Sequence, residues 1–274
     1  MNSQPNDPAP AQQRVPEPGA DPVLELRGIN KRFGAVQALT DINLTIGRGE
    51  VVGLVGDNGA GKSTLIKVIA GVHGCDEGEI IMNGISQKFA SPKDAQTAGV
   101  ATVFQDLSLC ENLDVVANLF LGHEATRGGV LDEVAMEAKS WELLRSLSAK
   151  IPSVRVPIAA LSGGQRQTVA IARSLLGDPS IVMLDEPTAA LGVAQTAEVL
   201  NLIERLRERD LGVLLVSHNM ADVQAVADRV HVLRLGKDAG DFPGDERTDV
   251  LVAAITGASD NVVTQRATRR GERR

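Results

Sequence analysis

The chain has 274 residues, 43% of them hydrophobic, and carries a formal net charge of −7. This length is enough for one large domain or two small ones. The acidic balance argues against a nucleic-acid partner, which would favour a basic face. No apolar run approaches the roughly 18 residues of a membrane span, and the N-terminus lacks the apolar core of a signal peptide. Any role at a membrane is therefore expected to depend on another subunit.

The composition divides the chain into a folded middle and two polar ends. Half of the twelve prolines precede residue 23, so residues 1–22 are predicted to form a disordered tail. Residues 23–242 are expected to fold as one domain, and residues 243–274 to form a partly disordered extension. Disorder is the preferred interpretation of the arginine-rich C-terminus, and contact with anionic lipid headgroups is the alternative. The arginines concerned are Arg266, Arg269, Arg270, Arg273 and Arg274.

Between residues 23 and 235, short apolar runs alternate with amphipathic segments. Strands are predicted over 23–26, 38–46, 51–55, 79–82, 100–104, 181–184, 213–216 and 229–235. Helices are predicted over 64–70, 131–150, 163–176, 193–208 and 220–227. Strands that alternate with helices favour an α/β fold with a mainly parallel sheet. The segment from 106 to about 160 departs from this order and is expected to form an inserted helical subdomain.

The most informative motif is G-x-x-x-x-G-K-S, which follows the apolar run at 51–55 and precedes a predicted helix. Glycine-rich loops in this position wrap backbone N–H groups around a phosphate chain, and the helix N-terminus adds a favourable dipole. Lys62 can reach the β- and γ-phosphates, and the Ser63 hydroxyl can bind Mg²⁺. The sequence thus predicts a site for ATP and Mg²⁺ formed by Gly56, Asp57, Asn58, Gly59, Ala60, Gly61, Lys62, Ser63 and Thr64.

Two carboxylates follow the buried strand predicted at 181–184. Such a strand would carry Asp185 to the sheet edge beside the phosphate loop, where it can hold Mg²⁺, through water. Glu186 is one residue further and could polarise a water molecule in line with the γ-phosphate, as a general base does. A solvated pair of acids at a strand end is the alternative for the pair taken alone.

The string Leu161-Ser162-Gly163-Gly164-Gln165 predicts a second phosphate-binding helix start. A serine hydroxyl, glycine N–H groups and the dipole of the helix from 163 would meet there. The string does not indicate whether the two phosphate-binding starts serve the same nucleotide.

Taken together, these motifs resemble the nucleotide-binding subunit of ABC transporters over residues 23 to about 242. The resemblance implies a P-loop NTPase fold with a RecA-like core, an antiparallel β subdomain and an inserted helical subdomain. It also implies a glutamine that contacts the metal and the reacting phosphate (Gln105), a switch histidine at the γ-phosphate (His218) and an aromatic stacked on adenine (Phe33). A core phenylalanine is the alternative for Phe33, where the family usually has tyrosine.

The same resemblance implies a head-to-tail dimer of two copies of this chain. Each ATP would lie between the phosphate loop of one subunit and Ser162, Gly163, Gly164 and Gln165 of the other. The helical subdomain would pass the closing and opening of the dimer to a membrane permease at the cytoplasmic face of the cell membrane, which in turn receives solute from a binding protein. One departure stands out, because Gly192 occupies the place of an aspartate that helps to couple the two sites.

Three further strings resemble importers of ribose, xylose or fructose. They are Gly56-Asp57-Asn58-Gly59, the run from Phe104 to Leu109, and the run from Val216 to Met220. The predicted function is therefore that of an ATPase energising sugar import, with another small solute such as branched-chain amino acids as the alternative. A soluble DNA-repair ATPase would need a long coiled coil between residues 105 and 161. The segment between these residues is long enough only for a few short helices, so this class is excluded. A non-hydrolysing subunit would lack Lys62, Glu186 or His218, and all three are present.

Overall fold

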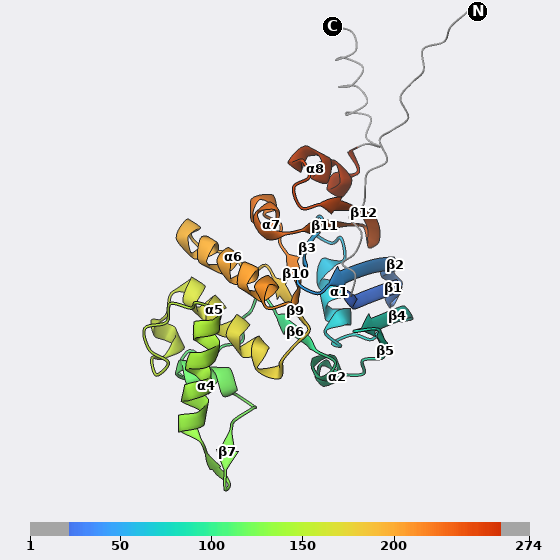
Figure 1. The fold of residues 1–274 in the computed structure, drawn as a ribbon. Coiled ribbons are helices and arrows are strands. Elements are labelled where there is room, and N and C mark those ends of the chain that lie inside the picture. The colour runs from blue at the N-terminus through green and yellow to red at the C-terminus, as the bar shows by residue number, and fades with distance from the viewer. Residues whose placement is uncertain (1–21, 259–274) are drawn as a thin grey trace, which may run out of the picture.

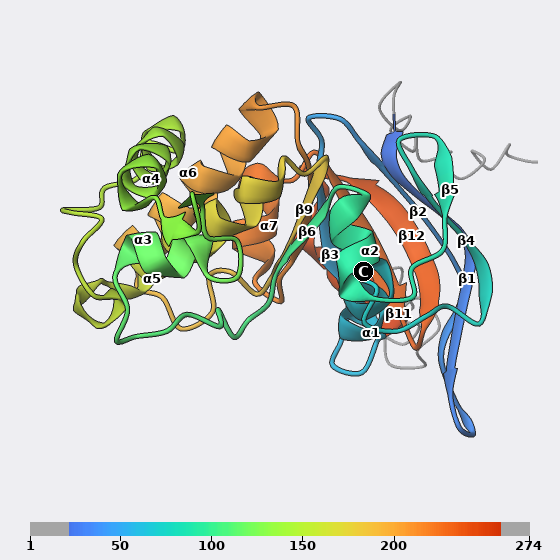
Figure 2. The same ribbon diagram turned by 90° about the horizontal axis from the view of Figure 1, so that it is seen from below.

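A computed structural model describes residues 22–258, in which two sheets and a helical layer pack side by side (Figure 1, Figure 2). The strands are β1 (Pro22–Phe33), β2 (Val36–Gly47), β3 (Val51–Val55), β4 (Glu77–Met82), β5 (Ile85–Gln87), β6 (Val100–Val103), β7 (Thr126–Arg127), β8 (Val130–Leu131), β9 (Ile181–Asp185), β10 (Gly212–Val216), β11 (Arg229–Arg234) and β12 (Lys237–Pro243). The helices are α1 (Lys62–Ile69), α2 (Pro92–Thr97), α3 (Val115–Phe120), α4 (Glu133–Ser146), α5 (Gly163–Ser174), α6 (Val193–Glu208), α7 (Met220–Val226) and α8 (Thr248–Thr256), with 3-10 turns at Ile158–Ala160 and Leu175–Gly177.

The larger sheet has the order β12-β11-β3-β10-β9-β6, and every pairing except β11 with β12 is parallel. Its inner strands β3 and β10 are buried along their whole length, as strands covered on both faces must be. The smaller sheet, β2-β1-β4-β5, is antiparallel. The predicted fold class, an α/β P-loop core with an antiparallel β subdomain and a helical subdomain, is confirmed.

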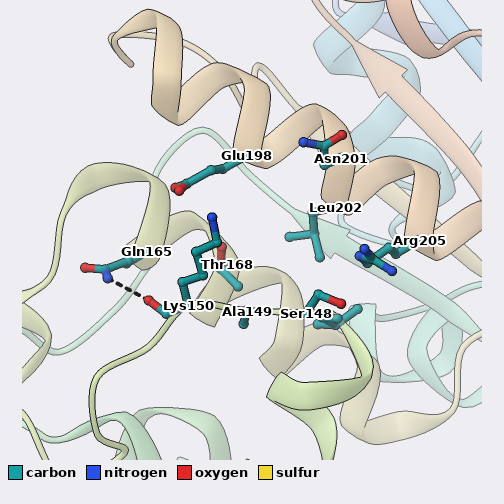
Figure 3. A pocket seen from close by; sticks show the side chains of 10 residues that line it. Ser148, Ala149, Lys150, Gln165, Thr168, Glu198, Asn201, Leu202 and Arg205 are labelled. Atoms are coloured by element: carbon teal, nitrogen blue, oxygen red, sulfur yellow. Dashed lines mark hydrogen bonds between the residues drawn. The ribbon is translucent and has the colours of Figure 1, made fainter.

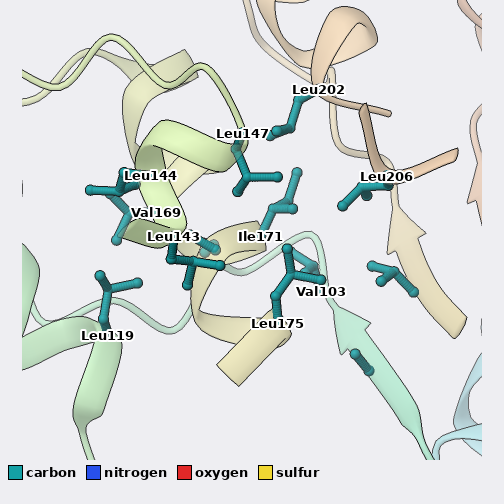
Figure 4. Close-up of a cluster of buried hydrophobic side chains, with 14 of the residues drawn as sticks. Val103, Leu119, Leu143, Leu144, Leu147, Val169, Ile171, Leu175, Leu202 and Leu206 are labelled. Atoms are coloured by element: carbon teal, nitrogen blue, oxygen red, sulfur yellow. The ribbon is translucent and has the colours of Figure 1, made fainter. Parts of the chain in front are cut away.

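Two hydrophobic cores lie on the opposite faces of the larger sheet, because side chains alternate along a strand. In β9, Val182 and Leu184 face a core shared with α3, α4, α5 and α6, whereas Ile181 and Met183 face a core shared with α1 and the antiparallel sheet. The first core continues into the helical subdomain, where leucines of several helices meet (Figure 4). This packing places α5, and with it Ser162, on one face of the sheet.

One local prediction differs from the structure, and two further elements were not predicted. The helix predicted over 131–150 is wrong at both ends: it begins at Glu133, where the Asp132 side chain accepts the N–H of Ala135, and it ends at Ser146. A two-stranded hairpin, β7 with β8, precedes it. The extension after residue 242 contains α8, which buries Leu251 against β11 and β12.

The predicted N-terminal tail, apart from Pro22, and the arginines from 266 onward lie outside the described residues. Among the helices that the structure describes, none is both long enough and apolar enough to cross a lipid bilayer.

Candidate functional site

The phosphate loop connects β3, at the centre of the larger sheet, to α1. The loop ends at Gly61, and α1 begins at Lys62, two residues earlier than predicted. Gly59 has a φ of +80°, and a Cβ built there would meet no described atom within 4 Å. The loop is therefore an open cradle, with the helix N-terminus facing it, which suits an anion.

The side chain of Lys62 lies across this loop. Its ammonium donates to the carbonyl oxygens of Gly56 at 2.6 Å and Asp57 at 3.0 Å. Burial lowers the pKa of Lys62, while the nearby carboxylates of Glu186, Asp57 and Asp185 oppose this shift. A partly desolvated cation held across the phosphate loop can bind a phosphate strongly, because little water must be removed from it.

Asp185 ends β9 beside the phosphate loop, as predicted from the apolar run before it. Burial raises the pKa of Asp185, the charge of Glu186 raises it further, and Lys62 and Lys67 oppose both effects. Burial and mutual repulsion disfavour the ionised form of two adjacent carboxylates, and positive charge nearby favours it. A divalent cation would supply this positive charge. Within residues 22–258, no cluster of three His, Cys, Asp or Glu side chains suits a metal ion, so such a cation would need oxygens from elsewhere.

Glu186 occupies a left-handed backbone conformation with φ +51°, which is strained for a residue with a side chain. Its N–H donates to the carbonyl of Val216 at 2.9 Å, which ties it to the end of β10. His218 follows that strand, and its Nδ1 lies 2.7 Å from Glu186 Oε2. The contact is close but not aligned as a hydrogen bond, so the buried Oε2 has no hydrogen-bond donor among the described groups. A buried oxygen in this state favours the binding of a donor such as water.

Most of these groups line one cavity of about 520 Å³, which we call the phosphate-loop cavity, whereas Gly56, Asp57 and His218 do not line it. Gln105, Asp185 and Glu186 line it together with residues 58–64. Gln37, at the start of β2, also lines the cavity, as do Leu235 and Gly236, in the turn between β11 and β12. These three lining residues were not predicted from the sequence, although Gly236 after the β11 run is a turn signal.

Phe33 does not line this cavity. Its ring is 43% exposed at the end of β1 and packs edge-on against His73, with ring centroids 5.1 Å apart. The Lys31 ammonium lies 5.4 Å from the centre of the same ring. Phe33 is therefore not a core residue, and its ring is partly exposed between His73 and Lys31.

The residues Ser162 to Gln165 lie at the start of α5 and do not line the phosphate-loop cavity. Gln165 Oε1 accepts the N–H of Ser162 at 2.9 Å, and Gln165 Nε2 donates to the carbonyl of Lys150 at 2.8 Å. Figure 3 shows this amide at the edge of a separate cavity of about 320 Å³ between α5, α6 and the loop after α4. Both ends of the Gln165 side chain are thus engaged within the subunit, which the motif alone did not indicate.

The N-terminus of α5 packs tightly against the loop that precedes α6. A Cβ added to Gly163 would lie 2.9 Å from Leu191 Cδ2, so the end of the Leu191 side chain would have to shift to admit a larger residue. In the same loop, Thr188 Oγ1 donates to Asp222 Oδ2 of α7 at 2.6 Å. Gly192 stands at the N-cap of α6, and its N–H is bound by Gln195 Oε1 at 3.3 Å.

Residues 39–189 match the family model of ABC transporters. The chain is 45% identical to the xylose/arabinose import ATP-binding protein of Sulfolobus acidocaldarius over 78% of this chain and 86% of that protein. It is 42% identical to the fructose import ATP-binding protein of Rhizobium meliloti, over 88% and 96% of the two chains. A ribose import ATP-binding protein of Yersinia pestis is 40% identical, but the chain spans only 43% of its length.

Solved structures agree with the sequence relatives. An ATP-binding cassette of an ABC transporter superposes with a TM-score of 0.77 at 25% identity, over 88% of this chain and 99% of that one. A bacterial ABC transporter cassette solved as a dimer superposes with a TM-score of 0.68 at 26% identity, over 82% of this chain and all of the other. This chain belongs to the ABC transporter family, and it is the ATP-hydrolysing cassette of that family.

Proposed function

We propose that this chain is the ATPase subunit of an importer for a simple sugar and that it acts at the cytoplasmic face of the cell membrane. The relatives whose length it matches import xylose, arabinose or fructose. The observation that carries the chemistry is the phosphate-loop cavity, which gathers a phosphate cradle, Gln105 and two carboxylates, with His218 touching one of them.

The residues of the cavity fit ATP and Mg²⁺. The open cradle at Gly59 and the ammonium of Lys62 suit a triphosphate, and the face of Phe33 suits the adenine. The Ser63 hydroxyl, Asp185 and Gln105 would hold Mg²⁺, with phosphate oxygens completing its shell, as this hard ion prefers oxygen ligands. When bound, Mg²⁺ would neutralise charge on the β- and γ-phosphates.

Hydrolysis would be assisted by Glu186 and His218. The buried Oε2 of Glu186 can accept a proton from a water molecule, which makes Glu186 the general base. His218 contacts the same oxygen from the exposed side, and we assign it to orient that carboxylate and to contact the γ-phosphate. Gln105 approaches from the end of β6 and would place the water.

The second half of the site would come from another copy of the chain. Ser162, Gly163, Gly164 and Gln165 do not line the phosphate-loop cavity of their own subunit, as expected for residues that meet a nucleotide held by a partner. The N–H groups of Gly163 and Gly164, at the start of α5, would face the γ-phosphate there. The dimeric state of a related cassette supports this arrangement.

A groove beside the Gln105 loop fits a segment of the permease. It has a volume of about 460 Å³ and continues into a smaller pocket of about 210 Å³. Lys93, His123, Lys139 and Arg173 line the larger part without any described Asp or Glu side chain, and Asp106 lines the smaller pocket. A cationic groove with apolar patches on an acidic protein favours an amphipathic segment that carries an acidic side chain. We call this surface the docking groove.

The test is to reconstitute the chain with its permease in lipid nanodiscs and to add the cognate binding protein loaded with single solutes. The proposal predicts that a pentose or hexose stimulates ATP hydrolysis, whereas branched-chain amino acids do not. Stimulation by an amino acid alone would overturn the assignment to sugars, and the absence of any hydrolysis would overturn the ATPase assignment.

A further inference from the structure

Two side chains of the helical subdomain hold the segment that follows Gln105. Arg173, in the last turn of α5, donates from Nη1 to the carbonyl of Ser108 and from Nη2 to the carbonyl of Leu107, both at 2.9 Å. The start of the same helix carries Ser162. A single rigid element therefore connects the loop of Gln105 to the residues that would meet the partner's ATP.

The second side chain is Asn118 of α3, which is fully buried. Its Oδ1 accepts the N–H of Cys110 at 2.7 Å, and its Nδ2 donates to the carbonyls of Cys110 at 3.0 Å and Asp114 at 2.9 Å. Ser108, which Arg173 holds two residues before Cys110, has a φ of +50°. Such a backbone conformation persists only when the surrounding structure holds it. From residue 107 onward, the loop is thus part of the helical subdomain.

Gln105 itself lies just before the first anchor. The strand β6 ends at Val103, so only residues 104–106 lie between the sheet and the carbonyl of Leu107 that Arg173 holds. A movement of the helical subdomain relative to the sheet must be absorbed in this short link, which carries Gln105 into the phosphate-loop cavity. Arg173 also lines the docking groove, so a permease segment would touch the same side chain.

We propose that Arg173 is a positioning residue for ATP hydrolysis. It sets the position of Gln105 and makes Gln105 move together with Ser162 to Gln165 at the start of α5. This inference rests on the proposed role of Gln105. Burial lowers the pKa of Arg173, which is consistent with a guanidinium that has exchanged water for the two carbonyls. Arg173 does not line the phosphate-loop cavity, so it acts through the loop and not on the nucleotide.

The test is a double-mutant cycle in the chain assembled with its permease. Arg173→Met removes the donors but keeps an unbranched side chain, and Arg173→Lys keeps the charge with a less complementary donor. Arg145→Met, on α4 beside Trp141, is the matched control. Arg173→Met is expected to lower kcat about 10- to 100-fold with little change in the KM for ATP, because misplacing a catalytic group by about 1 Å costs this much.

The cycle partner is Gln105→Ala. If Arg173 acts through Gln105, the double variant will be no slower than Gln105→Ala alone, whereas independent effects on log kcat would add. The inference would be overturned if the losses in log kcat of the two single variants added in the double variant. It would also be overturned if Arg173→Lys lost as much kcat as Arg173→Met. If Gln105→Ala leaves kcat unchanged, the proposed role of Gln105 fails first. Should Arg173→Met not fold, as judged by circular dichroism, the cycle is run with Arg173→Lys and decides the question in the same way.

Discussion

His218 Nδ1 lies 2.7 Å from Glu186 Oε2, although the two residues end different strands of the larger sheet. The N–H of Glu186 also donates to the carbonyl of Val216, which precedes His218 by two residues. The pairing of β9 with β10 therefore brings the His218 ring to the Glu186 carboxylate. The contact is made at a single carboxylate oxygen, Oε2. This pair is the structural basis for assigning Glu186 as the base.

Replacing Glu186 with Gln should lower the rate of ATP hydrolysis about 10²- to 10⁴-fold, the contribution typical of a general base. The amide keeps the shape of the site, so ATP binding should remain, and the unhydrolysed nucleotide should trap the dimer. Steady-state hydrolysis and gel filtration with ATP measure both effects. Turnover at the wild-type rate would exclude Glu186 as the base.

Replacing Ser162 with Arg should reduce hydrolysis about 100-fold, because it places a large side chain where N–H groups would meet the partner's γ-phosphate. Binding of a fluorescent ATP analogue to the isolated monomer should not change, since Ser162 does not line the phosphate-loop cavity. Ser86→Arg, at an exposed position in β5, is the matched control. Weakened binding to the monomer would show that Ser162 belongs to the site of its own subunit.

Replacing Gly163 with Ala should cost about 1 kcal/mol, because the new methyl group would lie 2.9 Å from Leu191 Cδ2 and would displace the end of that flexible side chain. Adding Leu191→Ala should relieve the overlap and recover part of both stability and hydrolysis. Gly177→Ala is the control, since a Cβ there meets no described atom within 4 Å. These values come from urea unfolding. Equal stability of Gly163→Ala and the wild type would refute the packing argument.

The folded state should lose stability at alkaline pH through His231. Burial opposes its charge, but hydrogen bonds to Asp238 and Asp241 outweigh this effect and raise the pKa of His231 to about 9. Because this folded pKa exceeds the ordinary value of 6.5, the stabilisation is complete below pH 6.5 and is lost as the pH rises through about 9. A shift of this size corresponds to about 3 kcal/mol.

Urea unfolding between pH 6 and pH 10 measures this loss. The His231→Gln variant cannot titrate and should show a flatter dependence over the same range. If the wild type and the variant follow parallel curves, His231 is not the responsible group.

The sequence was sufficient where the chemistry depends on neighbouring residues. The phosphate loop and the pair Asp185 and Glu186 were predictable, because an apolar strand before a polar motif fixes which sheet edge the motif reaches. His218 reaches Glu186 because β9 and β10 are neighbours in the sheet. The order of strands in a sheet cannot be read from the sequence of one chain. The same holds for Gln37 and Leu235 in the cavity wall, which come from the antiparallel sheet and from a distant turn.

Other features depended on competition between local and tertiary structure. The pattern over 131–150 indicated a longer helix, but a hairpin precedes it and Ser148, with φ +52°, follows its end. The engagement of Gln165 by the carbonyl of Lys150 has no counterpart in the motif, because the loop after α4 approaches only in the folded subunit. Both cases concern the helical subdomain, where the sequence carries fewer punctuating glycines and prolines than in the core.

The central claim, a site shared between two copies, is tested most directly by mixing two inactive variants. Lys62→Ala loses the phosphate-binding cation and Ser162→Arg loses the contribution in trans, so each homodimer lacks both sites. A head-to-tail heterodimer restores one complete site. An equal mixture should recover about a quarter of wild-type hydrolysis, as random pairing of two subunits predicts. A mixture no more active than the sum of the two separate variants would contradict the account.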